Sequence, residues 1–166
     1  LYNASLKNVN FSDAIIIDAD FRNADLTNAI IDIKELKNTS WRNADGIDIT
    51  LFTYDELYQL GLEELKFKNY PKAEYYFKNS LAINDLEIKT LMALFNLQIL
   101  QGNINDSEET IYKVKSYYEK KKDKVSIEKI NNIISAMNTD NTKDNYGNGI
   151  GVDLINAFSS LSNHLK

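Results

Sequence analysis

The 166-residue chain is 43% hydrophobic and carries a formal net charge of −5 at pH 7, a balance that does not predict binding to nucleic acid. It contains no cysteine and a single histidine, His164. Disulfides, thiolate catalysis, histidine triads and metal sites built from His and Cys are therefore excluded. No stretch approaches the roughly 18 consecutive apolar residues of a membrane-spanning helix.

Hydrophobic side chains return at every fifth position through the first third of the chain. An α-helix repeats about every 3.6 residues and a β-strand about every 2, so neither produces this spacing. A chain that turns a corner every five residues produces a five-residue spacing. A small residue stands two positions before most centres, as Ala24 does before Leu26. The centres of this pattern are Leu1, Leu6, Phe11, Ile16, Phe21, Leu26, Ile31, Leu36, Trp41, Gly46 and Leu51.

Segments such as 19–23 (ADFRN) and 24–28 (ADLTN) resemble the A-(D/N)-L-x-x pattern of the pentapeptide-repeat family. This resemblance implies a right-handed quadrilateral parallel β-helix over residues 1–53. In that family four pentapeptides make one coil, so residues twenty apart stack in columns. Neighbouring coils should then be spaced like hydrogen-bonded strands, about 4.7–4.9 Å apart.

The repeat departs from its pattern at two positions. Lys34 occupies an inward position where a small residue is expected, and a buried lysine without a partner is costly. We therefore expect the side from Asp32 to Leu36 to bulge and leave Lys34 outside. Gly46 replaces an apolar centre close to the end of the segment. Leu1 is already on the register, which predicts an N-terminally truncated β-helix whose earlier coils precede this sequence.

Three isoleucines stand at positions that should point outward from the β-helix. Ile15, Ile17 and Ile30 each lie next to a register centre, where the family usually has polar residues. Exposed aliphatic clusters tend to be covered by another surface, here either the TPR-like domain or another protein. We predict that these three residues contribute to a partner-binding site.

The five-residue pattern ends at Thr53, and residues 54–137 show helical spacing instead. The stretch resembles the tetratricopeptide (TPR) family, whose repeat of about 34 residues is a helix–turn–helix. Pro71 would open the second helix of the first repeat. A weaker second copy follows, in which Leu91 and Leu94 occupy the repeat positions of Leu57 and Leu60. A helix from about Ser126 to Met137 would cap the array. The residues that carry the first match are Leu57, Leu60, Gly61, Ala73, Phe77 and Leu81.

The resemblance to TPR proteins also nominates a groove, because the first helix of each pair lines the concave surface in that family. A largely apolar groove suits an amphipathic partner helix, although packing in the core explains the same residues. The nominated residues are Asp55, Tyr58, Leu62 and Leu65 in the first repeat and Lys89, Met92, Asn96 and Ile99 in the second.

The C-terminal part is predicted to contain a flexible linker at 138–151, rich in Asn, Asp, Gly and Thr, followed by an amphipathic helix at 152–166. That helix either folds back on the TPR-like array, even into its groove, or recognises a partner. Contact with a membrane surface is disfavoured, because the polar face lacks a cluster of basic residues.

The predicted fold class is α+β: a right-handed quadrilateral parallel β-helix, then an α-helical TPR-like hairpin array and a C-terminal amphipathic helix. The predicted function is a non-enzymatic protein–protein interaction scaffold or adaptor, without a cofactor, that binds a partner helix or a subunit of a larger assembly. We expect a soluble protein, intracellular or organellar rather than secreted.

The alternative function comes from pentapeptide-repeat proteins that imitate duplex DNA and bind a type II topoisomerase. Such mimicry needs a long acidic rod. Residues 1–53 carry five basic and eight acidic side chains, a net charge of −3, and Arg22 stacks with Arg42 in the predicted register. The charge pattern therefore favours the scaffold.

Overall fold

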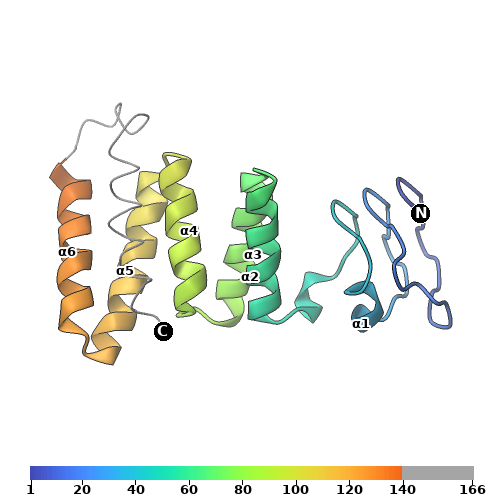
Figure 1. Ribbon diagram of the computed structural model, residues 1–166, viewed down its shortest axis with the longest axis horizontal. Helices are drawn as coiled ribbons and strands as arrows, with labels where there is room; N and C mark the ends of the chain where they lie inside the picture. The colour runs from blue at the N-terminus through green and yellow to red at the C-terminus, as the bar shows by residue number, and fades with distance from the viewer. Residues whose placement is uncertain (140–166) are drawn as a thin grey trace. The chain divides into compact units, whose positions relative to one another are not determined.

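The computed structural model describes residues 1–139 and divides the chain into two compact units, Leu1–Phe52 and Thr53–Lys166. We call the first the coil unit and the second the helical unit. Figure 1 shows the winding backbone of the coil unit and the helices of the helical unit. Apart from residues 138–139, the predicted linker (138–151) and the predicted tail helix (152–166) lie outside the described residues.

The coil unit turns a corner at nearly every five-residue repeat, and each corner is closed by a backbone hydrogen bond. The N–H of Ala24 donates to the carbonyl of Phe21 over 2.9 Å, and the N–H of Ala4 donates to that of Leu1 over 3.1 Å. The third residue of most such turns has a positive φ, for example 57° at Asn23. Asn and Asp tolerate this left-handed conformation better than other residues with a side chain. The recurrent Asn of the sequence is therefore a requirement of the turn.

Successive coils pair through residues that are twenty positions apart. The N–H of Leu6 donates to the carbonyl of Asp25 over 2.8 Å, and the N–H of Asp25 donates to that of Ala4 over 2.9 Å. Asn28 also donates through its side chain to Asn8, 3.3 Å away. All four parallel bridges of the described residues have this offset: Ser5–Asp25, Asn10–Ile30, Asp20–Ser40 and Asp25–Asp45.

The predicted fold class is nevertheless wrong, because residues 1–139 contain isolated bridges but no β-strand and no sheet. A strand needs consecutive residues that pair with the same neighbour. A corner every five residues interrupts the pairing after a single bridge, so the backbone never extends far enough. The described part of the chain is predominantly helical, and the coil unit is a stack of turns rather than a parallel β-helix.

The core of the coil unit is formed by the middle of the five-residue register. Ile16, Phe21, Leu26 and Leu36 are buried together with Ala24. Leu6, Phe11, Ile31 and Trp41 are half-buried, and the centres at the two ends, Leu1 and Leu51, are exposed. Phe21 meets the ring of Phe11 edge to face, with centroids 5.6 Å apart.

The side that carries Lys34 bulges as predicted. Residues Ile33–Leu36 form a single helical turn, α1, capped by the side chain of Asp32, which accepts from the N–H of Lys34 over 2.8 Å. Lys34 is exposed and Leu36 still points into the core. The unit ends with a short 3-10 turn, η1 (Ile49–Leu51), beyond which Phe52 packs on Trp41 with ring centroids 5.5 Å apart.

A glycine is required at position 46, where the last partial coil passes close to the backbone of the coil before it. Its φ is +80°, and a Cβ there would lie 2.5 Å from the backbone nitrogen of Thr27. We expect Gly46→Ala to lower the free energy of unfolding of the coil unit by about 2 kcal/mol or more, from backbone strain and steric overlap together. Hydrogen exchange resolved to residues 1–52 measures the loss.

Gly102 provides the matched control for this prediction. Its φ is +72°, yet a Cβ there would meet nothing within 4 Å. Gly102→Ala should therefore cost only the strain of the left-handed conformation, about 1 kcal/mol in the helical unit. Equal losses from the two substitutions would contradict the proposed close approach to Thr27.

The helical unit consists of helices that pack in chain order, each against the next (Figure 1). Within residues 53–139 these are α2 (Tyr54–Lys66), α3 (Tyr70–Ile83), α4 (Ile88–Leu100), α5 (Ile104–Lys121) and α6 (Lys124–Thr139). Short connections between consecutive helices make neighbours antiparallel, as in helical hairpins.

Local sequence explains where these helices begin and end. Thr53 and Glu56 form a capping box at the start of α2, in which each side chain accepts from the other residue's backbone N–H. Pro71 stands in the first turn of α3, where its missing N–H costs least. The side chain of Glu87 caps the start of α4, and Lys122, the residue after the end of α5, has a left-handed conformation.

Two hydrophobic clusters hold the helices together. The smaller joins α3 to α4 through Ala73, Phe77, Leu94 and Leu97. The larger joins α4, α5 and α6, and its buried members are Ile88, Leu91, Met92, Phe95, Ile99, Ile111, Val114, Tyr118, Ile130, Ile133 and Met137. Because α4 contributes to both clusters, it is buried on most of its circumference.

Candidate interaction surfaces

The three isoleucines nominated on the coil unit are exposed. Ile15 is 93% exposed, Ile17 63% and Ile30 57%. Ile15 and Ile17 flank the buried centre Ile16, whereas Ile30 lies over Asn10 on a neighbouring side of the coil. The structure therefore places two of the three on one side and the third around a corner. We call Ile15, Ile17 and Ile30 the isoleucine surface.

Polar side chains occupy most other outward positions of the coil unit, and their hydrogen bonds have a local structural role. Asp25 accepts from the N–H and hydroxyl of Thr27 over 3.1 and 2.6 Å, and Lys7 lies 3.0 Å from its carboxylate. Asn10 makes the same kind of contact with Ser12. Isoleucine can make none of these hydrogen bonds, so neither turn chemistry nor the core explains why Ile15 and Ile17 stand at outward positions.

The pair formed by Asp20 and Arg22 is the best-defined charged contact of the coil unit. Nε and Nη2 of Arg22 donate to the two carboxylate oxygens of Asp20 over 2.9 and 2.7 Å. These hydrogen bonds from the guanidinium hold the pKa of the Asp20 carboxyl at about 2, below the ordinary value of 3.8. The acidic surface of this unit is therefore partly neutralised by its own cations.

The lowered pKa of Asp20 makes a testable prediction about pH. The folded state keeps Asp20 ionised below the pH at which an unfolded chain would protonate it, so its contribution to stability is present above about pH 4 and is lost as pH falls towards 2. Following the carboxyl carbon by NMR should give a midpoint near 2, which Arg22→Gln should move towards 3.8. Asp48, whose pKa is lowered by hydrogen bonds from Thr50, serves as the control and should not respond to that substitution.

The groove residues of the first helical pair lie on one face of α2. Tyr58, Leu62 and Leu65 are half-buried and pack against the cluster around Phe77. The ring centroids of Tyr58 and Phe77 are 6.0 Å apart, and burial raises the pKa of the Tyr58 hydroxyl. Asp55, one turn earlier, is exposed. These residues form a partly open apolar row.

The nominated residues on α4 do not share one environment. Met92 is 6% exposed and Ile99 2% exposed, and both belong to the core that α4 forms with α5 and α6. Lys89 is exposed, and Asn96 is half-buried with a buried side-chain oxygen that has no hydrogen-bond partner. The resemblance to TPR proteins placed Met92 and Ile99 on the groove face, but it could not show that α6 would help to bury them.

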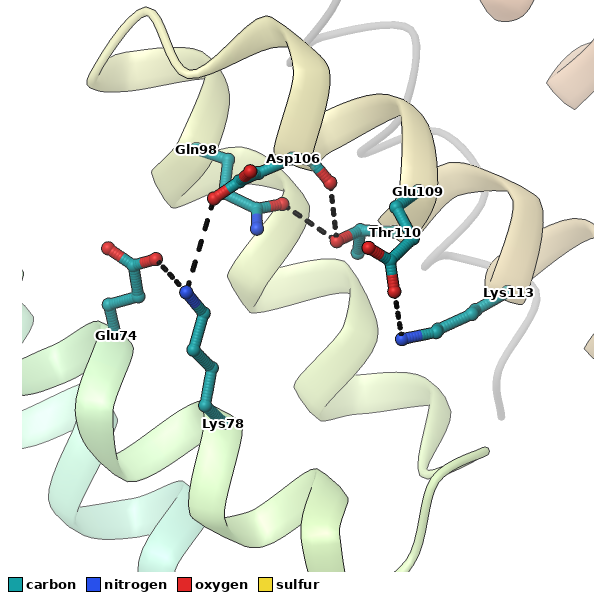
Figure 2. A network of polar contacts seen from close by, with 7 residues as sticks. All are labelled: Glu74, Lys78, Gln98, Asp106, Glu109, Thr110 and Lys113. Atoms are coloured by element: carbon teal, nitrogen blue, oxygen red, sulfur yellow. Dashed lines mark hydrogen bonds and ion pairs between the residues drawn. The ribbon is translucent and has the colours of Figure 1, made fainter.

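A polar network that the nominated residues do not include crosses from α3 to α5 (Figure 2). Lys78 contacts Glu74 at 2.7 Å and Asp106 at 4.0 Å, and the hydrogen bond that Lys78 donates to Glu74 raises the pKa of the Lys78 ammonium. A second ion pair, Glu109 with Lys113, lies on α5 at 2.7 Å. Both close pairs have the i,i+4 spacing of acidic and basic residues that stabilises exposed helices. This spacing is visible in the sequence and could have predicted both pairs.

Beneath these charges, a buried hydrogen bond joins α4 to α5. The hydroxyl of Thr110 donates to the side-chain oxygen of Gln98 over 2.8 Å, and both residues are buried (Figure 2). Buried polar groups of this kind are satisfied in folded proteins because an unpaired one is costly. The contact fixes the position of one helix against the next, so it supports the interhelical packing.

In residues 1–139, no set of three or more His, Cys, Asp or Glu side chains is arranged to hold a metal ion. No helix in the same range has the length and apolar character to cross a membrane.

Comparison with known protein families gives one match, to pentapeptide repeats, with eight copies over residues 1–31. The segment 54–137 that resembles TPR proteins is not matched by a family model. No curated protein and no solved structure matches the chain. The N-terminal segment therefore carries pentapeptide repeats, and stacked repeats of this kind often present extended surfaces for protein interaction.

Proposed function

We propose that this protein is a non-enzymatic interaction scaffold whose isoleucine surface docks another protein. The observation that carries the proposal is the 93% exposure of Ile15 at an outward position of the repeat. Neighbouring exposed apolar side chains, such as Ile15 and Ile17, are typical of protein-binding sites. Moving an isoleucine from water into an interface is worth about 1.5–3 kcal/mol, so Ile15 and Ile17 together can supply a useful part of a binding energy.

The helical unit supplies a second proposed surface, the apolar row of Tyr58, Leu62 and Leu65 on α2. Its consecutive antiparallel helices support the comparison with TPR proteins, which hold partner segments against the first helix of each pair. Lys89 and Asn96 would add polar contacts from α4, while Met92 and Ile99 would support the groove from the core. An amphipathic helix is the partner that such a row fits best.

The non-enzymatic part of the proposal rests on the residue types of the chain. The protein has no cysteine and a single histidine, His164, so a thiol nucleophile or a site built from two or more histidines cannot form within this chain. Its Asp and Asn residues in the coil unit are used by turns and by pairs such as Asp20 with Arg22.

Crosslinking from the coil surface tests the first site. A photoreactive amino acid placed at Ile15 should capture a partner from an extract of the source organism, whereas the same group at Thr27, an exposed polar position of the repeat, should capture much less. Once the partner is purified, Ile15→Asp should weaken its binding about tenfold or more, which corresponds to about 1.4 kcal/mol. Equal capture from both positions, or unchanged binding by Ile15→Asp, would rule out the isoleucine surface.

Charge reversal tests the second site without disturbing the core. Lys89 and Lys120 are both exposed lysines of the helical unit, but only Lys89 is among the residues nominated for the groove. Lys89→Glu should weaken binding of the purified partner and Lys120→Glu should leave it unchanged. If Lys120→Glu has the larger effect, the partner binds the helical unit elsewhere.

A further inference from the structure

We draw no further inference here: the strongest candidate, the group of carboxylates from Glu74, Asp106 and Glu109 around Lys78 on α3 and α5, is an acidic cluster whose Glu74 and Glu109 are each paired with a lysine, and nothing in the described residues points to a ligand for it.

Discussion

Replacing Phe21 with aspartate is expected to unfold the coil unit. Phe21 is fully buried and lies against Phe11 in the middle of the stacked turns. Removing a buried aromatic ring costs about 3–5 kcal/mol, and the new carboxylate would enter an apolar column without a partner. We expect a total loss of about 4 kcal/mol or more, which is a large part of the stability of most small units.

Hydrogen exchange read separately for residues 1–52 and 54–139 measures this effect, because the two units need not unfold together. Protection should disappear in the first range and persist in the second. Ile15→Asp is the matched control: it introduces the same charge into the same unit at a side chain that is 93% exposed, so stability should change by no more than about 0.5 kcal/mol. Wild-type protection in Phe21→Asp would refute the assignment of Phe21 to the core.

Replacing Gly61 with alanine is expected to destabilise the helical unit, although alanine favours helices more than glycine by about 1 kcal/mol. A Cβ at Gly61 would lie 2.4 Å from Cε1 of Phe77, whose ring is buried between α2 and α4. Relieving that overlap requires α2 and α3 to separate or the ring to leave its position. Overpacking of this kind costs about 1–3 kcal/mol, which thermal or denaturant unfolding of the full chain will detect.

A double-mutant cycle with Phe77→Leu separates this clash from any other effect of the substitution. Leucine lacks the ring edge that a Cβ at position 61 would meet. Gly61→Ala should therefore lower the free energy of unfolding much less in a Phe77→Leu background than in the wild type. If Gly61→Ala instead stabilises the wild-type protein, the space between α2 and α3 accommodates the new Cβ and the predicted clash is contradicted.

The glycine at position 61 illustrates what a sequence pattern can predict. Leu57, Leu60 and Gly61 are among the residues that carry the resemblance to the TPR pattern; that resemblance implied a helix pair, and α2 and α3 form one. The pattern did not show which side chain needs the glycine. That reason is a close approach between two helices, and only the packed structure contains it.

The groove residues show that the spacing of residues along a helix does not predict how deeply they are buried. Positions 58, 62 and 65 and positions 92, 96 and 99 fall on equivalent faces of two helices, so sequence treated them alike. In the structure Met92 and Ile99 belong to the cluster shared with α5 and α6, whereas Tyr58 and Leu62 stay half-buried. Burial depends on which later helices pack on a face, and this is a property of the whole helical unit.

The sequence by itself determined the corners of the coil unit, the inward centres such as Phe21 and the outward bulge at Lys34. Each of these follows from a short-range requirement: a left-handed turn residue, a narrow apolar interior or the cost of burying a charge. Only the tertiary structure decided that the coils pair through single bridges and not through strands, because the number of consecutive residues that pair depends on how the backbones of two coils lie against each other. It also decided that Gly46 must pass close to Thr27. Contacts between distant residues depend on how whole coils and helices stack, and no local pattern specifies that arrangement.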